Sequence, residues 1–177
     1  MPRLPYVPAD LAEPKDIVDA IRARRGGQLA ELDRVLLHCP PVASGWNTLL
    51  GSVRRDLTIS PKLRELAMCV VAVLNDAEYE WVAHAPLLEQ AGATPAQMKA
   101  LRDPDAAARD TTLFDPLERA TLALVIEMTR NVKVSDATYS TLRGLVDNDR
   151  QMFELIMTTA AYNMVSRILV ATGVEPS

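Results

Sequence analysis

Apolar residues recur along this chain at the spacing of helix faces, and the strict alternation of apolar and polar residues that marks a half-buried strand is almost absent. Proline, glycine, serine and aspartate interrupt the apolar runs where helices start and end. The pattern predicts an all-α fold, a single-domain helical bundle of about eight helices. The helical segments are expected within residues 15–25, 29–37, 42–55, 60–74, 75–92, 94–101, 115–129, 135–146 and 147–173, with a polar connection over 102–113.

The segment 60–92 is expected to form a helix hairpin at the centre of the bundle. Ser60 is a suitable N-cap and a proline follows it at the first helical position. The run 66–74 has no polar face, which is typical of a helix covered on most sides. Asn75 and Glu78 resemble a capping box and are expected to open the next helix. Two consecutive helices with a short link pack antiparallel, so these two should pair.

The first fourteen residues contain Pro2, Pro5, Pro8 and Pro14. Proline removes a backbone donor and fixes φ, so residues 1–14 are expected to form an extended arm. Residues 15–177 are then expected to make one helical domain.

Composition narrows the class of protein. The chain has 177 residues, 49% of them hydrophobic, and a net charge of −4, which together exclude disorder for most of it. The longest strongly apolar run, 66–74, falls far short of the roughly 20 residues of a membrane span, so no membrane partner is expected. The acidic balance argues against nucleic acid as a partner. Two cysteines and no apolar leader favour a cytoplasmic protein.

Glu65, Glu80 and His84 form the cluster with the clearest chemical potential. Glu80 and His84 stand four residues apart on one expected helix and share a face, and the hairpin lets Glu65 approach them. A histidine between two carboxylates in a groove of low dielectric is suited to proton transfer. The alternative is structural, because a glutamate early in a helix and a Glu–His pair at this spacing both stabilise helices.

The stretch 60–94 resembles the core of the carboxymuconolactone decarboxylase family, whose superfamily includes the alkylhydroperoxidase D group. The opening R-E-L-A, the centre Y-E-W-x-x-H and the close A-G-[small]-T carry the resemblance. The later helices, including the Ala161-Tyr162-Asn163 run, resemble longer members. The resemblance implies an alkylhydroperoxidase D-like fold, a small-molecule substrate and a homo-oligomer, as a dimer, trimer or hexamer.

The redox branch of that superfamily carries two cysteines between the glutamate and the histidine. In this chain Glu65 and His84 match the glutamate and histidine, while Ala77 and Glu80 occupy the cysteine positions. The dithiol mechanism therefore has no thiols at those positions. Cys69, inside the apolar run, is expected to be a core residue. Cys39 follows His38, which could activate its thiol or point away from it.

The decarboxylase branch resembles E-x-x-x-H, which Glu80 and His84 match, and it needs no metal or organic cofactor. The resemblance implies that His84 donates a proton to carbon after carbon dioxide leaves, with Glu80 orienting or recharging it and Glu65 supporting from further away. Candidate substrate-binding residues are Tyr79, Trp81 and Tyr162, each with packing as the alternative; Arg54, Arg55 and Arg64 are candidates for the substrate carboxylate.

Three other interpretations stay open. A thiol-dependent peroxidase, an antioxidant function, would use Cys39 or Cys69. A non-catalytic helical oligomer would bind a small ligand without reaction. A metal site on Glu65, Glu80 and His84 is the third, but di-iron bundles use Glu-x-x-His twice, whereas this chain has one pair at a spacing of four, so no metal is predicted.

Overall fold

The computed structural model describes residues 2–176, and every regular element in that range is a helix, which confirms the all-α prediction. The described residues form ten helices, rather than about eight. They are α1 (Lys15–Arg25), α2 (Glu31–Leu36), α3 (Pro40–Arg55), α4 (Pro61–Leu74), α5 (Glu78–Gln90), α6 (Pro95–Ala100), α7 (Pro104–Ala107), α8 (Pro116–Asn131), α9 (Asp136–Arg143) and α10 (Asp149–Thr172).

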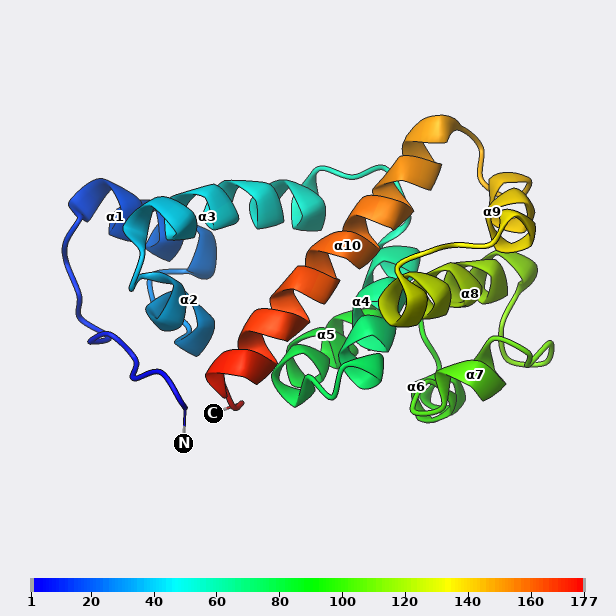
Figure 1. Ribbon diagram of the computed structural model, residues 1–177, viewed down its shortest axis with the longest axis horizontal. Coiled ribbons are helices and arrows are strands. Elements are labelled where there is room, and N and C mark those ends of the chain that lie inside the picture. The colour runs from blue at the N-terminus through cyan, green and yellow to red at the C-terminus, as the bar shows by residue number, and fades with distance from the viewer. Residues whose placement is uncertain (1, 177) are drawn as a thin grey trace. The chain divides into compact units, whose positions relative to one another are not determined.

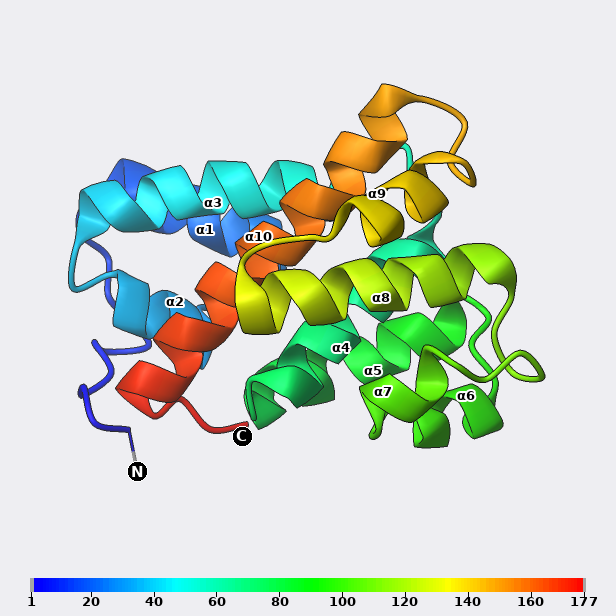
Figure 2. The same cartoon turned by 45° about the vertical axis from the view of Figure 1, so that its right-hand side comes forward.

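The chain divides into two compact units, of which the first comprises residues 2–57 and 169–175. In this unit α1 and α2 pack against α3, and Figure 2 shows α1 and α3 running side by side. Val18 and Leu50 are fully buried between them. Gly26 ends α1 in the left-handed region at φ 77°, where glycine has no steric penalty.

The second unit, residues 58–168, is built around α4. This helix packs most extensively against α5 and α8, as the prediction of a central hairpin requires, and α9 lies on α8 (Figure 1). Ser60 caps α4 by accepting a hydrogen bond from Leu63 N at 3.2 Å. Residues 66–72 of α4 are all buried, because the helix has neighbours on all of its faces.

The expected capping box at the start of α5 is wrong. The helix begins after Ala77, which has no side-chain cap, and Asn75 instead ends α4. The side-chain amide of Asn75 donates to Asn163 Oδ1 at 3.1 Å. Asn75 therefore bonds a residue that is distant in the sequence instead of capping α5. Asp76 lies at φ 52°, a left-handed conformation that aspartate tolerates, in the link that reverses the chain.

The expected polar connection over 102–113 contains a further helical turn, α7. Asp103 accepts a hydrogen bond from Ala106 N at 3.1 Å, and Pro104 occupies the first helical position. A cap followed by proline and alanine is enough to form one turn. This turn is one source of the higher helix count.

Within the described residues, α10 is the one helix that by length and composition alone could cross a membrane. Its most apolar 18-residue window has a mean hydropathy of 1.2, and 44% of that window is buried. The core helix of a soluble protein passes the same test, so this is weak evidence. The absence of a membrane partner, the homo-oligomer and the cytoplasmic location stay predictions.

A row of polar residues follows one face of α10 at intervals of four: Glu154, Thr158, Tyr162 and Ser166. All four are buried. Residues four apart on a helix share a face, and α10 crosses α4 and α5 with this face toward them (Figure 1). The side chains of Glu154, Tyr162 and Ser166 hydrogen-bond to residues of the second unit, whereas the Thr158 hydroxyl has no hydrogen-bond partner among the described residues.

Replacing Thr158 with valine is expected to stabilise the protein. The Thr158 hydroxyl is fully buried and has no hydrogen-bond partner among the described residues. An unsatisfied buried hydroxyl costs about 1 kcal/mol or more, and valine has the same shape without it. Thr159, also fully buried, donates to Leu155 O at 2.8 Å and is the matched control. Chemical denaturation should show a gain in unfolding free energy for Thr158→Val and a loss for Thr159→Val; equal losses would contradict this account.

Candidate functional site

His84 and Glu65 meet inside the second unit. The imidazole Nδ1 of His84, on α5, lies 2.7 Å from Glu65 Oε2, on α4, and both side chains are buried. Glu65 stands in the second turn of α4, and the antiparallel hairpin brings that turn level with His84. The sequence allowed Glu65 to approach this face of α5 without requiring contact, and it placed Glu65 in a more distant, supporting position. Glu65 instead contacts the imidazole directly.

Tyr162, on α10, contacts the other side of the same imidazole. Its hydroxyl lies 3.0 Å from His84 Nε2, and the two rings meet edge to face at 85° with centres 4.9 Å apart. Tyr162 is fully buried. Because the Glu65 carboxylate can only accept at Nδ1, the neutral imidazole carries its proton on Nδ1. Its Nε2 then accepts a hydrogen bond from the Tyr162 hydroxyl. Glu65, His84 and Tyr162 therefore form a continuous chain of hydrogen bonds.

The electrostatics of Glu65 favour its ionised form. Burial by itself would raise the pKa of this carboxyl. The hydrogen bond and charge of His84, together with Arg64, outweigh burial and hold the pKa of Glu65 below its ordinary value. The Nε of Arg64, one of the three candidate arginines, donates to Glu65 Oε1 at 3.2 Å, so Arg64 lies against a site residue. Glu65 is therefore a carboxylate whose negative charge can stabilise a protonated His84.

Glu80 is buried on α5, one turn before His84. Its Oε2 accepts a hydrogen bond from Ser166 Oγ at 2.8 Å. Ser166 was not predicted as a site residue. Its spacing of four from Tyr162 was the available signal, since a small polar residue on the buried face of a long helix needs a partner.

Cys69 does not offer a reactive thiolate at this site. Cys69 is fully buried on α4, and burial, followed by the charges of Glu65 and Glu80, raises the pKa of its thiol. It is a core residue, as predicted. Cys39 is exposed and lies in the first unit. A peroxidase that acts through a thiolate needs a low thiol pKa together with access to the peroxide.

Trp81 lies in a different environment from His84, although both are on α5. The Arg102 guanidinium stacks over the Trp81 ring at 3.7 Å and donates to Glu78 at 3.3 Å. Trp81, Glu78 and Arg102 line a cavity of about 350 Å³ at the link between α4 and α5. Tyr79 is half-buried on the same helix. The substrate-binding roles of Tyr79 and Trp81 stay predictions.

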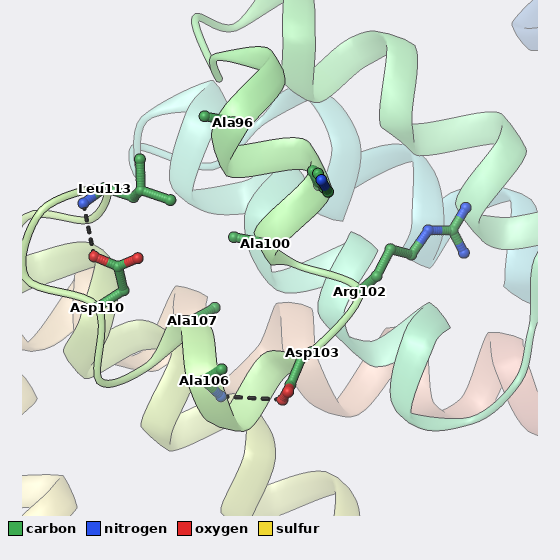
Figure 3. A pocket seen from close by; sticks show the side chains of 9 residues that line it. Ala96, Ala100, Arg102, Asp103, Ala106, Ala107, Asp110 and Leu113 are labelled. Atoms are coloured by element: carbon green, nitrogen blue, oxygen red, sulfur yellow. Dashed lines mark hydrogen bonds between the residues drawn. The ribbon is translucent and has the colours of Figure 1, made fainter.

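A larger cavity, of about 550 Å³, lies between α6 and α7. Four of its nine lining residues are alanine and four are charged. Figure 3 shows that Asp103 and Asp110 bond to the backbone of Ala106 and Leu113. None of the predicted site residues lines it. This cavity is therefore separate from the predicted site residues.

The candidate metal set receives no geometric support. Over residues 2–176, no group of three or more histidine, cysteine, aspartate or glutamate side chains is placed to hold a metal ion together. Glu65 Oε2 is occupied by His84 and Oε1 by Arg64, a cation that a metal ion would have to replace.

Comparisons with known proteins agree on the family and the fold. Residues 40–127 match the model of the carboxymuconolactone decarboxylase family. A peroxidase-related protein of Ralstonia eutropha JMP134, described as an alkylhydroperoxidase AhpD core, is 21% identical with a TM-score of 0.80, covering 99% of this chain and 92% of that one. A peroxidase-related protein of Silicibacter sp. TM1040 is 20% identical with a TM-score of 0.78, covering 98% and 90%.

A third similar structure is the debrominase Bmp8 in complex with 2,3,4-tribromopyrrole. It is 11% identical with a TM-score of 0.78, covering 97% of this chain and 90% of that chain. No curated protein matches this sequence. At these identities the solved structures show the fold alone, which confirms the alkylhydroperoxidase D-like architecture.

Proposed function

Because the chain belongs to the carboxymuconolactone decarboxylase family, we propose that it is an acid–base enzyme that moves a proton to or from carbon in a small organic acid or lactone. The buried chain of Glu65, His84 and Tyr162 is the observation that carries this proposal. Decarboxylation of an unsaturated lactone acid is the reaction of this class that we favour, and His84 is the group through which the proton passes.

The hydrogen-bond chain supports carbon protonation in the following way. Carbon dioxide leaves the substrate and its bonding electrons spread into the unsaturated lactone. The phenol of Tyr162 releases its proton to the carbon while the imidazolium Nε2–H of His84 reprotonates the phenol oxygen. Glu65 stabilises the imidazolium before the transfer, as its lowered pKa favours. One proton is consumed for each carbon dioxide released, and Glu80, one turn before His84 on α5, is our candidate for returning it to His84.

Burial makes this arrangement effective. Tyr162 is fully buried, and Glu65 and His84 are each less than a tenth exposed. In a site with little water, a fixed carboxylate and a fixed phenol interact with developing charge more strongly than they would in solution. The Arg64 side chain is 16% exposed and is our candidate for the substrate carboxylate, since guanidinium pairs with carboxylate in a bidentate geometry.

The proposal is tested by a substrate panel. Purified protein is assayed with carboxymuconolactone and related unsaturated lactone acids, following carbon dioxide release and loss of the substrate. We expect turnover of at least one member, and the same rate in a Cys39→Ser, Cys69→Ala double variant. A parallel assay measures reduction of hydrogen peroxide and an alkyl hydroperoxide with dithiothreitol as reductant. Peroxide turnover that the double variant loses, with no release of carbon dioxide, would instead establish the thiol peroxidase.

A further inference from the structure

Ser166 lies between two acceptors that both belong to the site. Its Oγ is 2.8 Å from Glu80 Oε2 and 2.9 Å from the carbonyl oxygen of Tyr162. Ser166 is fully buried and Glu80 is 1% exposed, so water does not compete for these contacts. A serine hydroxyl carries a single proton and therefore donates to one acceptor at a time.

Counting protons gives two arrangements. When Glu80 is ionised, the Ser166 hydroxyl donates to the Glu80 carboxylate, a charge-assisted bond. When Glu80 is protonated, its carboxyl O–H donates to Ser166 Oγ, and the Ser166 hydroxyl turns to the Tyr162 carbonyl. Both distances suit either arrangement. The two arrangements differ by one proton on Glu80 and by the rotation of the Ser166 hydroxyl.

We propose that Ser166 is a positioning residue that keeps Glu80 Oε2 and its own hydroxyl hydrogen-bonded whether Glu80 is ionised or protonated. A buried carboxylate that faces only a fixed donor is held in its ionised form. A hydroxyl can both donate and accept, so it can hydrogen-bond the carboxyl in either protonation state. Glu80 is thereby suited to recharge the proton chain one helical turn away at His84. This catalytic consequence rests on the proposed function; the hydroxyl rotation itself does not.

Several ionisable groups share the surroundings of Glu80. The charges of Glu65 and Glu80 both act on Cys69, which lies on α4. His84 lies one turn along α5, and Tyr162 lies one turn from Ser166 on α10. A pH titration of the whole site therefore has several contributors, and the test must observe the Glu80 carboxyl itself.

Infrared difference spectroscopy at varied pH observes that group. The stretching band of protonated Glu80 is identified as the carboxyl band that Glu80→Gln removes. In Ser166→Ala the carboxyl loses its acceptor, so we expect this band to move to higher wavenumber. Alanine removes the hydroxyl with little change in volume, and the fold should persist. The matched control is Thr159→Ala, which removes a hydroxyl that also bonds a carbonyl four residues back and should leave the band in place.

The outcomes are decisive for the proposal. A band shift in Ser166→Ala and none in Thr159→Ala establishes the contact with protonated Glu80. An unchanged band in Ser166→Ala, or no Glu80 carboxyl band at any pH at which the protein is folded, overturns it. Since the spectra need no substrate, failure of the decarboxylase proposal would not alter this result.

Discussion

Replacing His84 with glutamine is expected to lower kcat/KM for the turned-over lactone acid by roughly 10²- to 10⁴-fold, the range for loss of a general acid or base. Glutamine fits the space and keeps a hydrogen-bonding group between Glu65 and Tyr162, but it does not carry a proton between them. The imidazole contacts at 2.7 Å and 3.0 Å both depend on a ring that accepts at one nitrogen and donates at the other. Steady-state kinetics of carbon dioxide release measure the loss.

His38→Gln is the control for this variant. His38 is the only other histidine in the sequence, and its Nε2 lies 2.6 Å from the Pro5 carbonyl in the first unit. It should leave turnover unchanged. If His84→Gln retained full turnover with an unaltered circular dichroism spectrum, the proton would not pass through the imidazole and the mechanism would be wrong.

The helix positions were predictable because their signals are local. The start of α4 follows from Ser60 and a proline beside an apolar run, and α1 matches its predicted range at both ends. The approach of Glu65 to His84 was predictable as a possibility, since a short link pairs neighbouring helices, but the contact itself was not fixed by the spacing.

The remaining partners were not predictable, because they come from α10. Tyr162 is 78 residues from His84, and Ser166 is 86 residues from Glu80. Their positions depend on the angle at which α10 crosses α5, which no local spacing encodes. The capping-box prediction for Asn75 was wrong for the same reason. Glu78 is near in the sequence, but the Asn75 side chain bonds Asn163 on α10.

The polar row on α10 therefore has two parts with different roles. Tyr162 and Ser166 contact the ionisable groups of α5, where they serve the proposed chemistry. Glu154, two turns earlier, contacts only backbone and side-chain donors around the start of α4 and Arg150 on its own helix. The first pair should control activity, and Glu154 should control stability.

Glu154→Ala is expected to lower the free energy of unfolding by about 2 kcal/mol at neutral pH, since it leaves the buried Ile59 N–H and the two donors of Thr58 without their acceptor. Glu154 Oε2 accepts from Thr58 N at 2.8 Å, Thr58 Oγ1 at 2.9 Å and Ile59 N at 2.9 Å, and its Oε1 accepts from Arg150 Nε at 2.8 Å. These bonds fix the segment that leads into α4, which carries Glu65. Urea denaturation measures the loss. The matched control is Glu127→Ala, whose carboxylate also accepts several hydrogen bonds but at the surface.

The pH dependence of the unfolding free energy shows whether Glu154 stabilises the fold through its ionised carboxylate or only through packing. Burial would raise the pKa of Glu154, but the bonds from Arg150, Thr58 and Ile59 outweigh it and hold that pKa below the ordinary 4.5. A lowered folded-state pKa gives stability that is fully present above the ordinary value and is lost as the pH falls through the folded value. Unfolding free energies measured from pH 7 downward should therefore fall less steeply in Glu154→Ala than in the wild type. Parallel curves would show that the loss comes from packing, because packing does not respond to the proton.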